Sequence, residues 1–194
     1  MKKLTFAFLC AACVALMGAC GNSNENKDGE ISEKDANEIT KQLDLPKDGV
    51  NGYTGDAATD LKNVTDQNYI EIAKGIFGID VTPKAGWKLA EVKSPNQVNN
   101  LNIAYEVEGL DFNAEATAFF DQCAKIATDG VYPAKMDLNT GAMSRGEKCA
   151  TYADYLKVKD FGNMWFFDYG DKHIMFDISN WKNKLEIKLV LTSK

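Results

Sequence analysis

The chain has 194 residues with 22 basic and 28 acidic side chains, so its formal net charge at neutral pH is −6. Hydrophobic residues make up 45% of it and aromatic residues 10%, which is the composition of a globular protein with a sizeable core. The acidic balance and the lack of a Lys/Arg block argue against nucleic-acid binding, because phosphate backbones repel such a chain.

The beginning of the chain has the pattern of an export signal. Lys2 and Lys3 precede an apolar run from Leu4 to Met17, which suits a secretory signal and is too short to span a membrane. We therefore expect residues 1–19 to be a signal peptide that is removed. Removal takes two lysines and no acid, so 20 basic and 28 acidic residues remain and the net charge becomes about −8.

The stretch Leu16-Met17-Gly18-Ala19-Cys20 resembles the lipobox of bacterial lipoproteins, although that family usually has Leu, Val or Ile at the position of Met17. The resemblance implies that Cys20 is acylated, for example with palmitate, and becomes the first residue of the mature chain. Several acyl chains would anchor it stably in a membrane. Two alternatives are cleavage before Cys13, which would leave a very short apolar run, and an ordinary signal peptide with an incidental cysteine.

The residues after Cys20 read as a linker. No apolar residue occurs from Gly21 to Glu30, so we expect residues 20–30 to form a lipidated cysteine with a flexible tether. Residues 31–194 are then long enough for a single domain with its own core.

A weak calcium-site pattern overlaps this linker. Its oxygen ligands, spaced as in an EF-hand loop, would be Asn24, Asn26, Asp28 and Asp35. The first ligand is Asn instead of Asp, and the last is the shorter Asp instead of Glu, so affinity would be low. We expect no metal and no cofactor, with a polar tether as the simpler interpretation.

Apolar residues at helical spacing predict the helices. The clearest is the one in which Ala116, Phe119, Phe120 and Cys123 share one side. Another follows Thr65 and is ended by Gly78, with a strand around Ile70–Ile72 as the alternative. The predicted helices are Ser32–Leu43, Tyr69–Phe77, Asn113–Ala127 and Ala150–Leu156.

Alternating apolar residues predict the strands, with Gly170-Asp171 as a hairpin turn and residues 135–148 as an irregular insertion. The predicted strands are Trp87–Lys93, Leu101–Val107, Met164–Tyr169, Lys172–Ile178 and Leu185–Leu191. The fold class is therefore α+β, an antiparallel sheet of about five strands packed on one face by the amphipathic Asn113–Ala127 helix, with N-terminal helices.

Two cysteines remain beside Cys20 after processing. An exported compartment permits disulfides, so Cys123 and Cys149 are predicted to be bonded, with two buried free thiols as the alternative. The single histidine, His173, is interpreted as a surface strand residue. A Cys149–His173 thiol dyad stays open if Cys149 is reduced.

Two further features of the sequence concern ligand binding. Residues 141–148 have the glycine spacing of a phosphate-binding loop, but Glu147 stands where the lysine should be, so we reject it. Trp181 lies in a predicted turn, residues 180–183, and is a candidate ligand contact. The simpler interpretation is that Trp181 covers the sheet edge, while Trp87 and Trp165 belong to the core.

The order of these features, with Gly86-Trp87 opening a strand pair after the tether, is similar to small lipoproteins of Bacteroides-type bacteria. The resemblance implies a protein of the cell envelope, anchored in the outer membrane or at the cell surface, and transfers no catalytic residue. We expect a non-enzymatic binding or interaction module with an unidentified protein or glycan partner, and the membrane as its other partner through the lipid. The alternatives are a glycan-handling or other hydrolase using sheet-edge carboxylates, and a weak calcium-dependent module.

Overall fold

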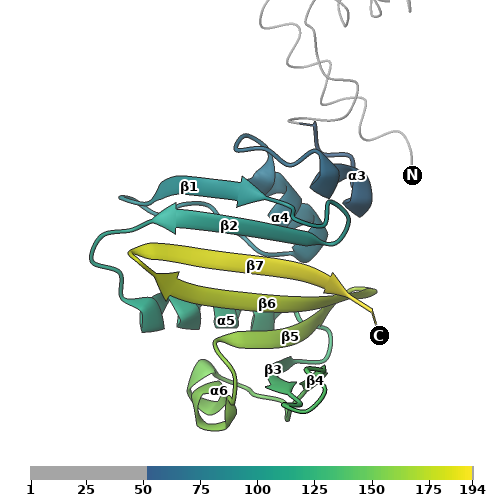
Figure 1. Cartoon of the computed structure of the whole chain (residues 1–194), viewed down its shortest axis with the longest axis vertical. Helices are drawn as coiled ribbons and strands as arrows, with labels where there is room; N and C mark the ends of the chain where they lie inside the picture. The colour runs from purple at the N-terminus through teal and green to yellow at the C-terminus, as the bar shows by residue number, and fades with distance from the viewer. Residues whose placement is uncertain (1–51, 194) are drawn as a thin grey trace, which may run out of the picture. The chain divides into compact units, whose positions relative to one another are not determined.

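The computed structural model describes residues 52–193, which form an α+β unit with an antiparallel sheet (Figure 1). The predicted signal peptide, Cys20, the tether, the weak calcium ligands and the Ser32–Leu43 helix lie outside these residues. The predicted fold class is confirmed, but the predicted number of strands was too low: the sheet has seven.

The strands follow the order β1-β2-β7-β6-β5-β3-β4 across the sheet, and every neighbouring pair is antiparallel. They are β1 (Lys88–Lys93), β2 (Asn100–Glu106), β3 (Val131–Met136), β4 (Met143–Arg145), β5 (Met164–Tyr169), β6 (Lys172–Trp181) and β7 (Lys184–Thr192). The helices between residues 52 and 193 are α3 (Ala57–Lys62), α4 (Tyr69–Phe77), α5 (Phe112–Ile126) and α6 (Tyr152–Val158).

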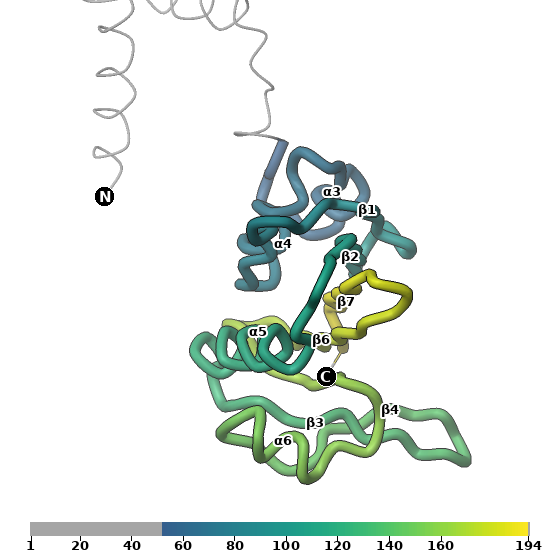
Figure 2. Tube along the Cα trace, turned by 90° about the vertical axis from the view of Figure 1, so that its left-hand side faces the viewer, coloured from purple at the N-terminus to yellow at the C-terminus, as the bar shows by residue number. Residues whose placement is uncertain are grey.

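Alternation along the strands gives the sheet two different faces. On β7, Leu185, Ile187 and Leu189 are fully buried, while the residues between them are only partly buried. Figure 2 shows α4 and α5 on one side of the sheet and the β3–β4 hairpin projecting on the other side. We call the side that carries the helices the covered face and the other side the open face.

Aromatic rings fill the core between α5 and the covered face. Phe120 and Phe119 lie on the buried stripe of α5, as the helical spacing predicts. The rings of Trp165 on β5 and Phe176 on β6 are stacked with centroids 4.7 Å apart, and Phe120 meets Trp165 edge-on at 5.4 Å. Offset and edge-on aromatic pairs of this kind add to the stability that burial provides.

Helix α4 confirms the helix predicted for Tyr69–Phe77 against the strand alternative, although Asn68 and not Thr65 is its N-cap residue. It ends at Gly78, whose φ of 73° lies in the left-handed region that favours glycine. A Cβ atom at Gly78 would lie 2.7 Å from Ile126 Cδ1, so the end of α4 approaches α5 more closely than a side chain at this position would allow.

The described chain begins with a segment that is fastened to α3 and α4. Asp60 on α3 is 1% exposed and accepts hydrogen bonds from Thr54 N at 2.8 Å, Thr54 Oγ1 at 2.8 Å and Gly55 N at 2.9 Å. Tyr53 packs directly on α4 at Gly75, where a Cβ atom would lie 2.1 Å from the Tyr53 hydroxyl. Buried hydrogen-bonded carboxylates of this kind hold a segment in one conformation.

Residues 135–148, predicted as an irregular insertion, belong instead largely to a hairpin. β3 pairs with β5 on one side and with β4 on the other, so this hairpin extends the sheet by two strands. Asp137 holds the connecting turn, because its Oδ1 accepts a hydrogen bond from Asn139 N at 2.8 Å. The three-residue length of β4 leaves no periodic pattern to detect.

The turn predicted at residues 180–183 is shorter than expected. β6 continues to Trp181, and the connection to β7 consists of Lys182 and Asn183 alone. Their φ angles are 51° and 62°, as a two-residue turn with the twist of the hairpin requires. Trp181 is therefore the last residue of a strand and not a turn residue.

Candidate functional site

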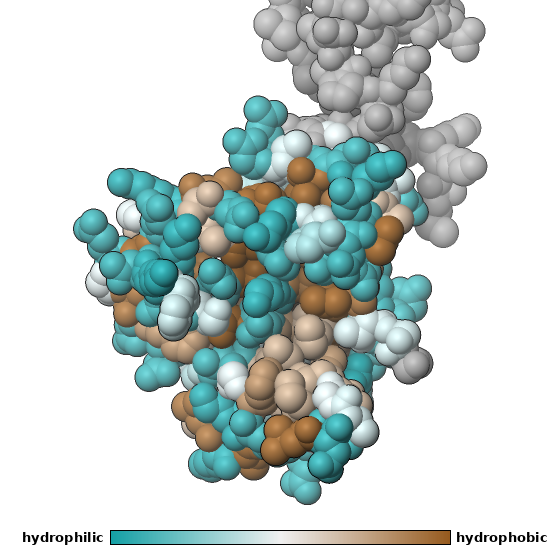
Figure 3. Space-filling view, in the orientation of Figure 1, coloured by the Kyte–Doolittle hydropathy of each residue, from teal (hydrophilic) through white to brown (hydrophobic). Residues whose placement is uncertain are grey.

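The open face carries a groove at the β3–β4 hairpin. Figure 3 shows apolar side chains exposed among polar ones on this face, above the hairpin. β4 forms one wall of the groove, and β5, β6 and the end of β7 form its floor. The volume is about 430 Å³, and the lining residues are Met143, Ser144, Arg145, Phe166, Asp168, His173, Met175, Thr192 and Ser193.

An aspartate and the single histidine meet at this groove because of hairpin register. The two-residue turn between β5 and β6 pairs Asp168 directly with His173, and both side chains lie on the open face. His173 Nδ1 lies 2.7 Å from Asp168 Oδ1. His173 lies in strand β6 on the open face, as predicted for a strand residue, but its side chain is only 14% exposed and is partly buried in the groove.

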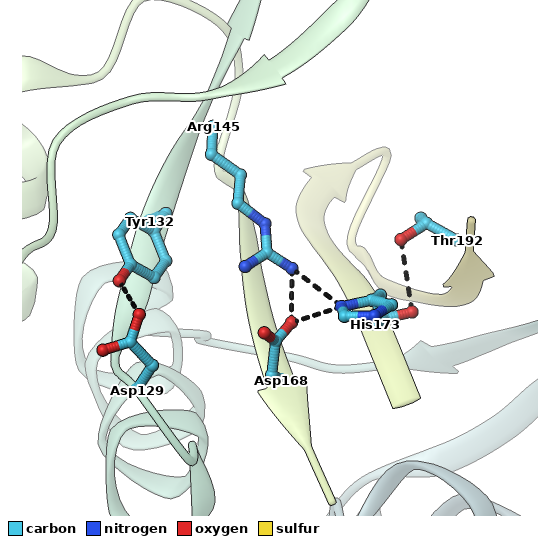
Figure 4. A network of polar contacts seen from close by, with 6 residues as sticks. All are labelled: Asp129, Tyr132, Arg145, Asp168, His173 and Thr192. Carbon is cyan, nitrogen blue, oxygen red and sulfur yellow. Dashed lines mark hydrogen bonds and ion pairs between the residues drawn. The ribbon is translucent and has the colours of Figure 1, made fainter. Parts of the chain in front are cut away.

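Arg145 completes this cluster from the wall of the groove. Figure 4 shows that Arg145 and His173 both point towards Asp168, and Arg145 Nη2 donates to the same Oδ1 atom that faces His173. The guanidinium lies 5.5 Å from the ring centre of Tyr132 and 5.9 Å from that of Phe166. Stacking on two rings and an ion pair with Asp168 fix the position of this charge.

The carboxylate of Asp168 determines which ring nitrogen of His173 faces it with a hydrogen. The hydrogen bond from Arg145, and after it that from His173, lowers the pKa of the Asp168 carboxyl, so Asp168 is an acceptor only. His173 Nδ1 must therefore carry the hydrogen that it shares with Asp168. Its Nε2 makes no hydrogen bond within residues 52–193.

Neighbouring groups support the cluster from both sides. Thr192 Oγ1 donates to the backbone carbonyl of His173 at 3.2 Å, which ties the end of β7 to β6. The Tyr132 hydroxyl donates to Asp129 Oδ2, which orients the ring beneath Arg145 (Figure 4). The groove is therefore built on hydrogen-bonded strands rather than on a long loop.

Cys149 takes no part in this cluster. Within residues 52–193 no contact joins it to His173, so the thiol dyad is not formed.

The structure also has Cys123 and Cys149 as free buried thiols, without the predicted disulfide. The two sulfurs have different neighbours: Trp165 Nε1 donates to Cys123 Sγ at 3.3 Å, while Cys149 Sγ lies 3.6 Å from the Glu147 carbonyl. Burial raises the pKa of the Cys123 thiol to about 12, so this sulfur is a poor nucleophile.

The tryptophans differ in exposure. Trp165 is fully buried, and Trp87 is partly buried with its ring 5.3 Å from that of Tyr105, so both belong to the core as predicted. Trp181 is 65% exposed and has Lys182 Nζ 5.9 Å from its ring, so it does not pack against the sheet edge. It lies outside the lining of the groove.

Carboxylates gather elsewhere without forming an acid-base pair. Glu106, Glu108, Asp111 and Glu115 line a second hollow of about 730 Å³, in which lysines are interspersed. Asp177 on the open face has a carboxyl pKa that burial raises most and the charge of Glu186 raises further, but its ion-pair partner is Lys188, with Nζ at 3.5 Å. A glycosidase would require one carboxyl with a raised pKa facing a second across a cleft.

Residues 52–193 contain no group of three His, Cys, Asp or Glu side chains placed to hold a metal ion. No helix in this range has both the length and the apolar character to cross a membrane. Comparison of the chain with protein-family models, with curated proteins and with solved structures gave no match.

Proposed function

We propose that this protein is a membrane-anchored envelope lipoprotein whose domain is a non-enzymatic binding or interaction module, with the groove on the open face as its binding site. The observation that carries the proposal is a preformed polar cluster, Arg145, Asp168 and His173, in a groove on a sheet face over which none of the described helices lies. Sites for small ligands are typically concave, mostly apolar and furnished with a few fixed polar groups.

The size and construction of the groove support this proposal. A volume of about 430 Å³ lies within the range of small-molecule sites. The polar groups stand on paired strands and on a stacked guanidinium, so little conformational entropy is lost when a ligand binds. Methionines at positions 143 and 175 supply adaptable apolar surface.

A hydrolase is the second candidate, because Asp168 orients His173 in the manner of a general-base pair. Within the described residues, however, no hydroxyl or thiol contacts the His173 ring, so the pair has no nucleophile to activate. An enzyme would have to use water directly. The binding module needs no such addition and is the stronger proposal.

The anchor is tested by mass spectrometry of the mature protein purified from its native membrane. We expect an N-terminal peptide that begins at acylated Cys20, because acylation follows from the lipobox resemblance. A Cys20→Ala variant should remain in the unprocessed form. An unmodified N-terminus at another residue would overturn the proposed lipid anchor, and the proposed binding site would be unaffected.

The binding site is tested by NMR on the isotope-labelled chain from Gly21 onward, which lacks the predicted signal peptide and lipid. The probes are a panel of small organic acids, amines, neutral sugars and short peptides. Binders should shift backbone resonances of β4 to β7 and leave those of α4 and α5 unchanged. Binders that map only to the Trp181 hairpin, or a panel without any binder, would contradict the proposal.

The same panel separates the hydrolase candidate. Esters and glycosides of 4-nitrophenol are added as substrates, and release of the nitrophenolate is followed by absorbance. We expect no turnover above the rate in buffer. Turnover that disappears in His173→Asn would replace the binding module with the enzyme.

A further inference from the structure

The unsatisfied donors of Arg145 indicate what kind of ligand the groove takes. We propose that it binds a small organic anion, a carboxylate carried on an apolar body, with Arg145 as the partner of the carboxylate. The inference rests on the binding module proposed above and names its ligand class. Each of its steps comes from the contacts of Arg145 and of the side chains around it.

Some N–H donors of the Arg145 guanidinium have no protein partner within the described residues. Its Nη2 is bound to Asp168, whereas Nε and Nη1 have no partner within residues 52–193. The side chain is 34% exposed and faces the groove of which it is a wall. A fixed guanidinium with free N–H groups is the preferred protein partner for carboxylates.

The carboxylates near Arg145 already have partners of their own. Asp168 is the carboxylate of the groove lining, and its Oδ1 accepts from both Arg145 and His173. Asp129, the next acid, accepts from the Tyr132 hydroxyl and lies 3.7 Å from Lys148 Nζ. Oδ1 of Asp168 is thus used twice, while the N–H groups of Arg145 Nε and Nη1 are left for a ligand group rich in acceptors.

The apolar residues of the groove lining favour a ligand that carries an apolar group beside its carboxylate. Met143 on the wall and Met175 on the floor are partly buried, and Phe166 is 6% exposed beneath the guanidinium. Apolar surface at both sides of one charge fits a carboxylate attached to a ring or a short chain better than it fits a sugar or inorganic phosphate.

Asp168 limits the strength of this site. Its negative charge offsets the positive charge of Arg145, so recognition relies on the N–H groups of Nε and Nη1 and on the apolar contacts. The electrostatic attraction between the site and the ligand is therefore short-ranged, and it requires that the ligand carboxylate lies directly beside Arg145. Binding should be specific for the carboxylate rather than proportional to negative charge.

A matched set of probes tests the inference: 3-phenylpropionate, 3-phenylpropanol, 3-phenylpropylamine and acetate. Titrations of the chain from Gly21 are followed by NMR at the resonances of β4, β5 and β6. We expect 3-phenylpropionate to bind at least about tenfold more tightly than the alcohol or the amine, as loss of a charged hydrogen bond predicts. Acetate should bind more weakly than 3-phenylpropionate because it lacks the apolar body.

Variants assign the effect to the groove. Arg145→Gln should weaken binding of 3-phenylpropionate at least about tenfold. Lys88→Gln is the matched control, because Lys88 is an exposed lysine at the far edge of the open face and its loss changes the net charge equally. It should leave the affinity unchanged.

A second pair of variants guards against a folding defect in Arg145→Gln. Met143 lies on the short edge strand, lines the groove and is partly exposed, so a charged side chain in its place can reach solvent. Met143→Lys should tighten binding of 3-phenylpropionate and Met143→Glu should weaken it, each by about fivefold, as expected for charges near a protein surface.

The outcomes separate this inference from the proposed function. Equal affinity for the alcohol and the carboxylate, or equal effects of the two Met143 variants, would overturn the ligand class. If sugars, amines or peptides of the wider panel bound the groove instead, the binding module would stand without this inference. A groove that bound none of these compounds would overturn both.

Discussion

The two faces of the sheet are built by the same strands but differ in burial, in packing and in polarity. On β6, Phe176 is fully buried on the covered face, and the adjacent Met175 is partly exposed on the open face. The covered face is filled by aromatic rings, while the open face carries the Arg145–Asp168 ion pair and a groove. Neighbouring residues of one strand thus serve stability on one side and contact with the surroundings on the other.

This difference shows why the open face can carry a site. A helix packed on one face supplies the hydrophobic free energy that the sheet needs, so the opposite face is free to hold polar groups and hollows. The polar cluster can then change in evolution with little effect on folding. The comparison leads to three predictions, ordered from the largest expected effect to the smallest.

The largest difference is expected between the adjacent residues of β6. Phe176→Ala should lower the free energy of unfolding by about 3–5 kcal/mol, because it leaves a cavity against Trp165. Met175→Ala should cost less than about 1.5 kcal/mol, since its side chain lies on the open face. Urea unfolding followed by circular dichroism measures both. Equal losses would show that the open face is as tightly packed as the covered one.

A smaller difference is expected between two glycines with positive φ. Gly78→Ala should lower stability by about 2–4 kcal/mol, because the left-handed backbone is strained and the new methyl group meets Ile126 and Tyr169 on the covered side. Gly170→Ala, in the turn after β5, has open space around its Cβ and should cost about 1–2 kcal/mol. Thermal unfolding of both variants checks the difference. A milder effect at Gly78 would mean that α4 and α5 separate easily.

The smallest effects concern two aspartates of the open face. Arg145 lowers the pKa of Asp168, so its carboxylate stabilises the fold at neutral pH, and Asp168→Asn should cost about 1 kcal/mol there. That loss should shrink as the pH falls through the folded-state pKa of Asp168. Burial raises the pKa of Asp177, so its carboxylate opposes folding at neutral pH, and Asp177→Asn should be slightly more stable than the parent.

Unfolding measured from neutral to acidic pH distinguishes these two aspartates. The difference between Asp177→Asn and the parent should vanish below the ordinary pKa of a free aspartate, where the folded and unfolded chains are both protonated. A stabilising Asp168→Asn at neutral pH would contradict the ion pair with Arg145, and with it the geometry of the groove.

Much of the fold could be predicted because its elements carry strong local patterns. The Asn113–Ala127 helix has apolar residues at every turn, and β7 alternates from Lys184 to Leu189, so both were confirmed within a few residues. β3 and β4 escaped detection, because Pro133 interrupts the first and the second has three residues. Such strands form only because β5 offers a free edge to pair with.

Part of the candidate site could be predicted from the sequence. With Gly170-Asp171 predicted as a two-residue turn, antiparallel register pairs residue 168 with residue 173, which already brings Asp168 and His173 together. Arg145 could not be placed, since it lies 23 residues before Asp168 in a hairpin that the sequence did not indicate. Its stacking on Tyr132 and Phe166 depends on three strands being assembled.

The hydrogen bonds of Asp60 determine where a pulling force on the chain would enter the domain. A pull on the chain from its N-terminal side would reach the described domain at the segment that Asp60 holds through Thr54 and Gly55. Figure 1 shows α3 beside the β1 end of the sheet, whereas β4, which forms a wall of the groove, is the strand at the opposite edge. Tension would therefore enter this fold at one edge of the sheet, with five strands between that point and the β4 hairpin.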